Sequence, residues 1–140
     1  MKKLLFLLLL ISVQQLSAQK EKEFELINQT LLDYIEGTAN GEPNRLKRAF
    51  HKDFNLYYVQ NDSLKIWNGQ EYMAGIKEGQ KSNRIGRVVS IDYTDSAATA
   101  KIEIDMPARK RLYTDYLILL KYEGQWRIIH KSFTFKEYGK

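Results

Sequence analysis

The stretch that decides the fold runs from Arg111 to Phe135 and reads RLYTDYLILLKYEGQWRIIHKSFTF. Two runs rich in Leu, Ile, Tyr, Phe and Trp flank the pair Glu123-Gly124, a pattern typical of a β-hairpin with a tight turn. This is the most apolar part of the chain after the N-terminus. Any hydrophobic core must therefore be built on this hairpin.

The turn also predicts which residues of the two strands face each other. The predicted partners are Tyr122 with Gln125, Leu119 with Ile128, Leu117 with His130, and Asp115 with Ser132. Because side chains alternate between faces, one face holds Tyr113, Asp115, Leu117, Leu119, Trp126, Ile128, His130 and Ser132. The other holds Leu112, Tyr116, Ile118, Leu120, Ile129, Phe133 and Phe135. Both faces are largely apolar.

The preceding residues predict three helices and four further strands. Apolar residues at three- and four-residue steps predict a helix over 21–39, Pro43 begins a short second helix, and Asn68 caps a third that ends at Gly79. Strands are predicted over 54–60, 64–67, 88–93 and 97–106, the last two joined at Asp95-Ser96. Helices grouped with a mostly antiparallel sheet indicate an α+β domain.

Residues 1–18 have the layout of a secretory signal peptide. Lys2 and Lys3 precede a short apolar run from Leu4 to Val13, and Ala18 supplies a small residue at the cleavage point. The alternative is an uncleaved anchor, although the run is about half the ~20 residues that a spanning helix needs. We expect residues 19–140 to form a single periplasmic or secreted domain.

Composition argues against several classes of function. The net charge of +5 falls to +3 without Lys2 and Lys3, and the basic residues are scattered, which does not favour nucleic-acid binding. There is no cysteine, and the two histidines lack helix-spaced partners such as H-E-x-x-H. No metal site and no cofactor are expected. Neither a G-x-S-x-G motif nor a phosphate-binding glycine loop is present.

The two apolar faces of the last hairpin predict an assembly. Helices can cover only one face, and the other would be a larger bare patch than monomers usually tolerate. We expect a homodimer packed through the face bearing Tyr116, Ile118, Ile129 and Phe133. In the alternative, the strands bend enough to bury both faces within one chain.

The first face predicts a small-molecule pocket, because an apolar wall with few polar groups is the usual composition of such sites. The candidate ligand-binding residues are Tyr34, Tyr58, Trp67, Tyr113, Asp115, Leu117, Trp126 and His130. His130 and Asp115 are also catalytic candidates, since a carboxylate can orient an imidazole and raise its basicity. The alternative is a hydrogen-bonded core pair without a catalytic role, or an Asp115 that is held by a nearby arginine or backbone N–H.

At these residues the chain resembles a known superfamily. The runs Tyr113 to Leu117, Leu119 to Lys121 and Glu123 to Ile129 resemble the closing strands of NTF2-like proteins, and most of all the "putative lumazine-binding" group of small exported bacterial proteins. The resemblance implies a cone made of a bent mixed or antiparallel sheet packed against three helices from the N-terminal half. It also implies a pocket and frequent pairing through the sheet.

Three functions stay open, because this fold serves enzymes and binding modules alike. The first is non-enzymatic binding of a small, partly aromatic molecule in the cone. The second is a cofactor-free isomerase, lyase or hydrolase with His130 as base and Asp115 as its orienter. The third is a structural dimerisation module whose cone is filled by its own side chains.

Overall fold

The computed structural model describes residues 2–139 as three helices, a short 3-10 helix and a six-stranded sheet. In chain order the elements are α1 (Lys2–Asn40), α2 (Pro43–Ala49), β1 (Phe50–Gln60), β2 (Ser63–Asn68), α3 (Gly69–Ala74), β3 (Ile85–Thr94), β4 (Ala97–Met106), η1 (Pro107–Arg109), β5 (Arg111–Tyr122) and β6 (Gln125–Glu137). The strand order is β2-β1-β6-β5-β4-β3, with β1 and β6 parallel and the other neighbours antiparallel. This confirms the predicted α+β class with a mixed sheet.

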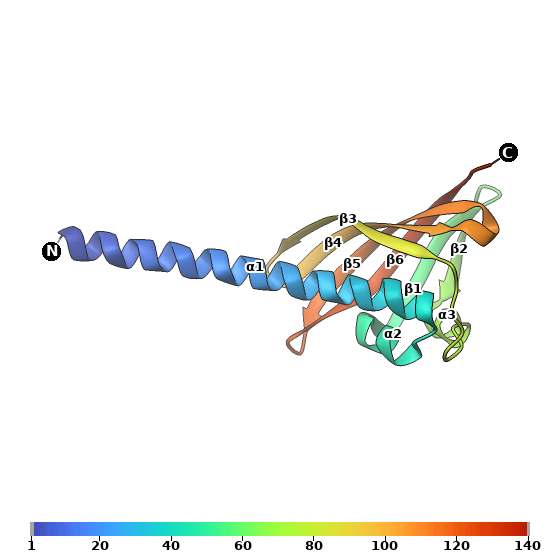
Figure 1. Cartoon of the computed structure of the whole chain (residues 1–140), viewed down its shortest axis with the longest axis horizontal. Coiled ribbons are helices and arrows are strands. Elements are labelled where there is room, and N and C mark those ends of the chain that lie inside the picture. The colour runs from blue at the N-terminus through green and yellow to red at the C-terminus, as the bar shows by residue number, and fades with distance from the viewer. Residues whose placement is uncertain (1, 140) are drawn as a thin grey trace.

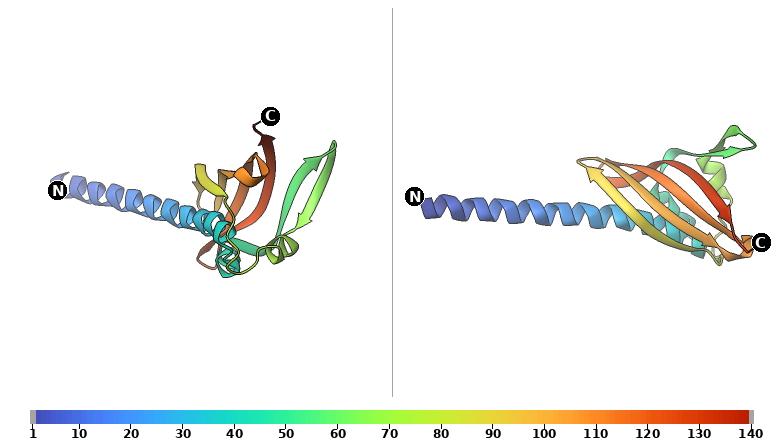
Figure 2. Two further views of the ribbon diagram at one scale, coloured as in Figure 1. Left: turned by 45° about the vertical axis from the view of Figure 1, so that its right-hand side comes forward. Right: turned by 90° about the horizontal axis from the view of Figure 1, so that it is seen from above.

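The sheet is bent, and the C-terminal half of α1 crosses its concave face (Figure 1). The β1–β2 hairpin curves away from the other strands, which opens the cone at one end (Figure 2). The helix joins the core through an apolar stripe at three- and four-residue spacing, in which Ile27, Leu31, Tyr34 and Ile35 are buried as predicted. Phe24, which the same pattern assigns to the stripe, is 46% exposed. The N-terminal part of α1 projects past the edge of the sheet (Figure 1).

Helices α2 and α3 begin where the sequence predicts, whereas α1 begins at Lys2 rather than at Glu21. Pro43 is the first residue of α2. Asn68 caps α3, since its Oδ1 accepts from the backbone N–H groups of Gln70 at 2.9 Å and Glu71 at 3.2 Å. However, α3 ends at Ala74 rather than near Gly79. It is therefore a short element that closes one side of the cone.

The last hairpin turns at Glu123-Gly124 as predicted, but its register changes part-way along. Leu119 pairs with Ile128, whereas Ile118 pairs with His130, so Ile129 is an extra residue in β6. Such a β-bulge reverses the alternation of all later side chains relative to an unbroken strand. The partners of Leu117 and Asp115 are accordingly Lys131 and Phe133, and the predicted pairs with His130 and Ser132 are wrong.

A second bulge lies in the other antiparallel hairpin. A turn at Asp95-Ser96 predicts that Tyr93 pairs with Ala98, Ile91 with Ala100 and Val89 with Ile102. The first two pairs are present, but Val88 rather than Val89 opposes Ile102. The bulge lies between Val88 and Ser90, so the register that the turn predicts holds only for the pairs nearer the turn.

A polar cluster links α1 to the end of the sheet that carries the β5–β6 turn, away from the open end of the cone. Glu23 accepts hydrogen bonds from Lys121 Nζ at 2.5 Å and from Trp126 Nε1 at 2.9 Å. These donors lower the pKa of Glu23, the Lys121 bond having the larger effect. Trp126 is thus a buried anchor for α1.

This cluster predicts a pH-dependent contribution to stability. The folded-state pKa of Glu23 lies below its usual 4.5, so the contribution is fully present above about pH 4.5 and is lost as the pH falls through the folded value. We expect Glu23→Gln to flatten the acid limb of a plot of unfolding free energy against pH. Urea titrations at neutral and acidic pH measure it, with Glu25→Gln, an exposed position on the same helix, as the control. Parallel acid limbs in wild type and Glu23→Gln would contradict the prediction.

Candidate active or binding cavity

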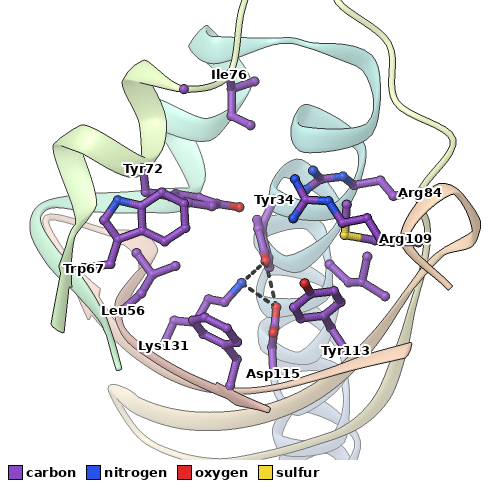
Figure 3. Close-up of a pocket in the computed structure, with 14 residues that line it drawn as sticks. Tyr34, Leu56, Trp67, Tyr72, Ile76, Arg84, Arg109, Tyr113, Asp115 and Lys131 are labelled. Carbon is purple, nitrogen blue, oxygen red and sulfur yellow. Dashed lines mark hydrogen bonds and ion pairs between the residues drawn. The ribbon is translucent and has the colours of Figure 1, made fainter. Parts of the chain in front are cut away.

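The open end of the cone contains a cavity of 260 Å³. Its walls come from α1, α3, the loop before β3, η1 and the concave side of the sheet (Figure 3). The lining residues are Tyr34, Leu56, Trp67, Tyr72, Gly75, Ile76, Arg84, Ile104, Met106, Arg109, Tyr113, Asp115, Lys131 and Phe133. The cone therefore keeps an open space, whose volume is slightly below the roughly 300 Å³ at which drug-sized sites begin.

Three polar side chains meet at the floor of the cavity. Tyr34 from α1 donates its hydroxyl to Asp115 Oδ2 at 2.7 Å, and Lys131 Nζ from β6 lies 2.8 Å from the same oxygen. Lys131 Nζ also donates to the hydroxyl oxygen of Tyr34. All three residues are buried, so this Tyr34–Asp115–Lys131 triad is a polar network inside an apolar shell (Figure 3).

The surroundings determine the protonation of the triad's phenol. Burial raises the pKa of Tyr34 well above 10.0, and the negative charge of Asp115 raises it further. The Tyr34 hydroxyl therefore stays protonated at neutral pH and acts as a hydrogen-bond donor. The ammonium group of Lys131 lies 4.9 Å from the ring centre of Tyr34, 5.5 Å from that of Tyr72 and 5.2 Å from that of Phe133. Its cation is thus held by one carboxylate and three aromatic faces.

One oxygen of this network has no partner. Asp115 is 1% exposed, and among residues 2–139 nothing donates a hydrogen bond to its Oδ1. A carboxylate can accept about four hydrogen bonds, and an unsatisfied buried acceptor costs about 1–3 kcal/mol or more. The cavity floor therefore contains a buried acceptor that has no partner among residues 2–139, beside two donors already in place.

The walls above the triad are mainly aromatic. The rings of Trp67 and Tyr72 meet edge to face with centres 5.2 Å apart on one side, and Tyr113 and Phe133 lie 6.1 Å apart on another. Aromatic walls with a few convergent polar groups suit a small planar ligand. In the described part of the chain, no three His, Cys, Asp or Glu side chains gather as metal ligands.

The structure brings together half of the candidate ligand-binding residues. Those that line the cavity are Tyr34, Trp67, Tyr113 and Asp115. Leu117 and Trp126 belong to the hydrophobic core, and Tyr58 stacks on Phe133 with ring centres 5.0 Å apart, outside the cavity lining.

His130 lies on the opposite face of the sheet from Asp115. Its ring stacks on Tyr57 at 4.7 Å, in a shallow groove on the convex side that also includes Lys101 and Tyr116. The His130–Asp115 pair considered as an acid–base couple is therefore not formed. The bulge at Ile129 causes this, since it turns His130 outward and brings Lys131 into the cone.

The same shift moves Phe133, which the sequence assigns to the dimer face, onto the cavity side. Sequence reasoning missed Lys131, Tyr72, Arg84 and Arg109 as cavity residues. Lys131 could have been found from the sequence, because it is a lysine within an apolar strand that pairs with the strand of a buried carboxylate.

Comparison with known proteins agrees with this architecture. The profile of the family described as "Putative lumazine-binding" matches residues 22–134. The chain belongs to this family. That confirms the resemblance seen in the last hairpin.

Relatives of this family member include a named enzyme and several NTF2-like structures. "Aldolase FrzH" from Cladobotryum sp. is 29% identical over 114 residues, covering 79% of this chain and 90% of the relative. An NTF2-like protein of unknown function from Shewanella baltica OS155 is 24% identical, covers 84% of this chain and 96% of its own, and superposes with a TM-score of 0.72. A putative scytalone dehydratase from Novosphingobium aromaticivorans is 15% identical, with coverages of 89% and 93% and a TM-score of 0.63. The fold of the family member is thus NTF2-like.

Proposed function

We propose that this NTF2-like domain binds a small, partly aromatic molecule in its cavity, with a hydroxyl or N–H of that molecule donating to Asp115 Oδ1. The observation that carries the proposal is the unpaired Oδ1 of Asp115, a cavity-lining residue that is 1% exposed. Because this oxygen is itself buried, the donor group of the ligand must displace neighbouring side chains to reach it. A donor supplied by the ligand would satisfy it where the protein does not.

The rest of the cavity supports a ligand of this kind. Trp67, Tyr72 and Tyr113 offer aromatic surfaces for a planar body. Tyr34 and Lys131 hold the Asp115 carboxylate in one orientation, which favours a single pose. The volume of 260 Å³ is close to the roughly 300 Å³ at which drug-sized sites begin, so the ligand is compact.

The test is ligand retention and affinity. Native mass spectrometry of protein purified from its own host should show a co-purified small molecule. We expect Asp115→Asn to weaken its binding roughly 10- to 100-fold, as expected for loss of a charge-assisted hydrogen bond. Trp67→Ala, at a partly exposed wall position, should weaken binding without unfolding the domain.

The control variant is Asp92→Asn, which removes an exposed carboxylate on the convex side of the sheet. It should bind as wild type does. If folded Asp115→Asn and Trp67→Ala proteins bound the molecule with wild-type affinity, the proposal would be refuted. It would also be refuted if no molecule co-purified and none of the purified host metabolites bound.

A second candidate, supported by the triad and by the aldolase-named relative, is proton-transfer catalysis at a carbonyl compound. The ammonium of Lys131 would polarise the carbonyl oxygen, Tyr34 would orient the carboxylate of Asp115, and Asp115 would exchange a proton with the adjacent carbon. Incubation of the bound molecule in D₂O distinguishes the two candidates. Deuterium uptake by wild type but not by Lys131→Met would indicate an enzyme, whereas binding without uptake would indicate a binding domain.

The location and assembly of the protein are further parts of the proposal. We propose that residues 1–18 are a signal peptide and that residues 19–140 act in the periplasm or outside the cell. The side-chain contact of Tyr93 with the Lys20 carbonyl, at 2.7 Å, supports a folded domain that begins near there. In the part of the chain that the structure describes, no helix is long and apolar enough to cross a membrane. A mature protein whose measured mass does not correspond to a chain that begins at Gln19 would contradict the cleavage site.

We also propose a homodimer that packs through the convex side of the sheet. Phe133 is not part of this surface, because it lines the cavity. Tyr116 is 51% exposed, Ile118 42% and Leu120 39%, so this strand presents apolar surface outward. Light scattering of wild type and Tyr116→Lys tests it, and a wild-type mass equal to one chain would exclude the dimer.

A further inference from the structure

Two arginines at the mouth of the cavity extend the description of its ligand. Arg84 precedes β3 and Arg109 ends η1, and both line the cavity that holds the triad. In Figure 3 both guanidinium groups point toward the centre of the cavity, from the side opposite Trp67 and Tyr72. Two separate loops therefore direct cations into one small space.

These arginines differ from most others in the chain in having no acidic partner. The arginines that pair with a carboxylate are Arg45, Arg48, Arg87 and Arg111. Within residues 2–139, neither Arg84 nor Arg109 forms an ion pair, and the Nε of Arg84 donates to the Ser82 hydroxyl at 3.0 Å. Their positive charge is directed at the cavity, and no carboxylate of the described residues neutralises it through an ion pair.

Both loops are fastened to the fold. The Ser82 N–H donates to the Ala39 carbonyl at 2.7 Å, which ties the Arg84 loop to the end of α1. The Lys110 N–H donates to the Pro107 carbonyl at 3.0 Å, and Lys110 adopts a left-handed conformation with φ of 50°, which closes the η1 turn behind Arg109. The two cations are thus carried by positioned segments, which reduces the entropy cost of ligand binding.

The charge of the cavity is correspondingly one-sided. Arg84, Arg109 and Lys131 are cationic, Asp115 is the one anionic side chain of the lining, and it is already paired with Lys131. An anionic group on the ligand would neutralise the positive charge of Arg84 and Arg109 at the mouth, without competing with the triad at the floor. Guanidinium groups match the planar, bidentate geometry of a carboxylate.

We propose that Arg84 and Arg109 bind a carboxylate of the cavity ligand. The ligand class is then a small aromatic acid whose other end carries a hydroxyl or N–H. This inference rests on the proposed binding function and adds the orientation of the ligand. The donor group of the ligand lies at Asp115, and its carboxylate lies at the mouth of the cavity.

The test compares small aromatic acids with their primary amides, which have nearly the same shape but no charge. Saturation-transfer NMR identifies which members of matched acid–amide pairs bind, and calorimetry gives the Kd of each binder. We expect acids to bind wild type more tightly than their amides. The variant Arg84→Gln/Arg109→Gln should weaken acid binding roughly 10- to 100-fold and leave amide binding nearly unchanged.

The matched control is Arg87→Gln, which removes an exposed arginine three residues from Arg84 that pairs with Glu103 outside the cavity. It should keep the wild-type Kd for acids. Equal acid affinities in wild type and the double variant, equal affinities for acids and amides in wild type, or no binding of acids at all would each overturn the inference. The proposed function is judged separately, by the effect of Asp115→Asn on the co-purified molecule.

Discussion

Replacing Lys131 by methionine is expected to lower the free energy of unfolding by about 3–5 kcal/mol. Removing one partner of a buried ion pair leaves the other charge uncompensated, and Asp115 is 1% exposed. Methionine approximates the length of the lysine stem, so the loss reports the charge and its hydrogen bonds rather than packing. Urea unfolding at neutral pH followed by circular dichroism measures the change.

The same reasoning predicts that the loss is recoverable. Replacing all three members of the triad, in the variant Tyr34→Phe/Asp115→Leu/Lys131→Met, removes every buried polar group that would be left unpaired. Buried ion pairs can be exchanged for apolar groups of similar volume at little cost, and sometimes with a gain of about 1–4 kcal/mol. We therefore expect the triple variant to be far more stable than Lys131→Met alone.

The control for this series is Lys136→Met, an exposed position further along β6, which should change stability by less than about 0.5 kcal/mol. A Lys131→Met protein as stable as wild type would show that the pair is not buried as described. A triple variant no more stable than the single one would show that the loss comes from packing. If the triple variant folds well but binds no ligand, the triad is retained for function.

Replacing Phe54 by alanine is the second large effect, with an expected loss of about 3–5 kcal/mol. Phe54 is 1% exposed, its ring stacks on Phe50 with centres 4.1 Å apart, and it meets Tyr72 edge to face at 6.3 Å. Its ring and backbone also crowd Gly69, where a Cβ would lie 2.6 Å from the ring. Removing the ring leaves a void under α3 and loosens the wall that carries Tyr72.

Two readouts separate this effect from a general loss of apolar surface. Phe24→Ala, at a position that is 46% exposed on α1, should cost much less, because little of that ring leaves water on folding. Ligand affinity should also fall in Phe54→Ala under conditions where the protein is still folded, since Tyr72 lines the cavity. Equal losses of stability in the two variants would contradict this account of the core.

The elements of this fold follow from local patterns in the sequence. The stripe on α1, the cap at Asn68 and the turn at Glu123-Gly124 each rest on interactions within a few residues, and each is present in the structure. The position of the cavity follows from the packing of those elements. That is why Tyr34 and Asp115, on the faces that the periodicity directs inward, are both found there.

The chemistry of the cavity could not be read in the same way. Whether residue 130 or residue 131 faces inward depends on the extra residue Ile129, and a bulge inside an apolar run has no local sequence signature. Arg84 and Arg109 come from loops whose direction is determined by distant contacts, such as that between Ser82 and Ala39. The two features that most restrict the ligand are therefore tertiary.

The bulge in β6 also affects how relatives of this protein should be compared. A gap inside a strand is ordinarily treated as an alignment error, because losing one residue reverses every later side chain. Here β6 contains one residue more than its partner strand requires, so a relative that lacks Ile129 could form a regular strand and still turn the residue equivalent to Lys131 inward. A one-residue gap between Trp126 and Lys131 would then be correct. Alignments that forbid it would place an outward-facing residue in the column of the buried lysine, and would hide the triad in homologues that have it.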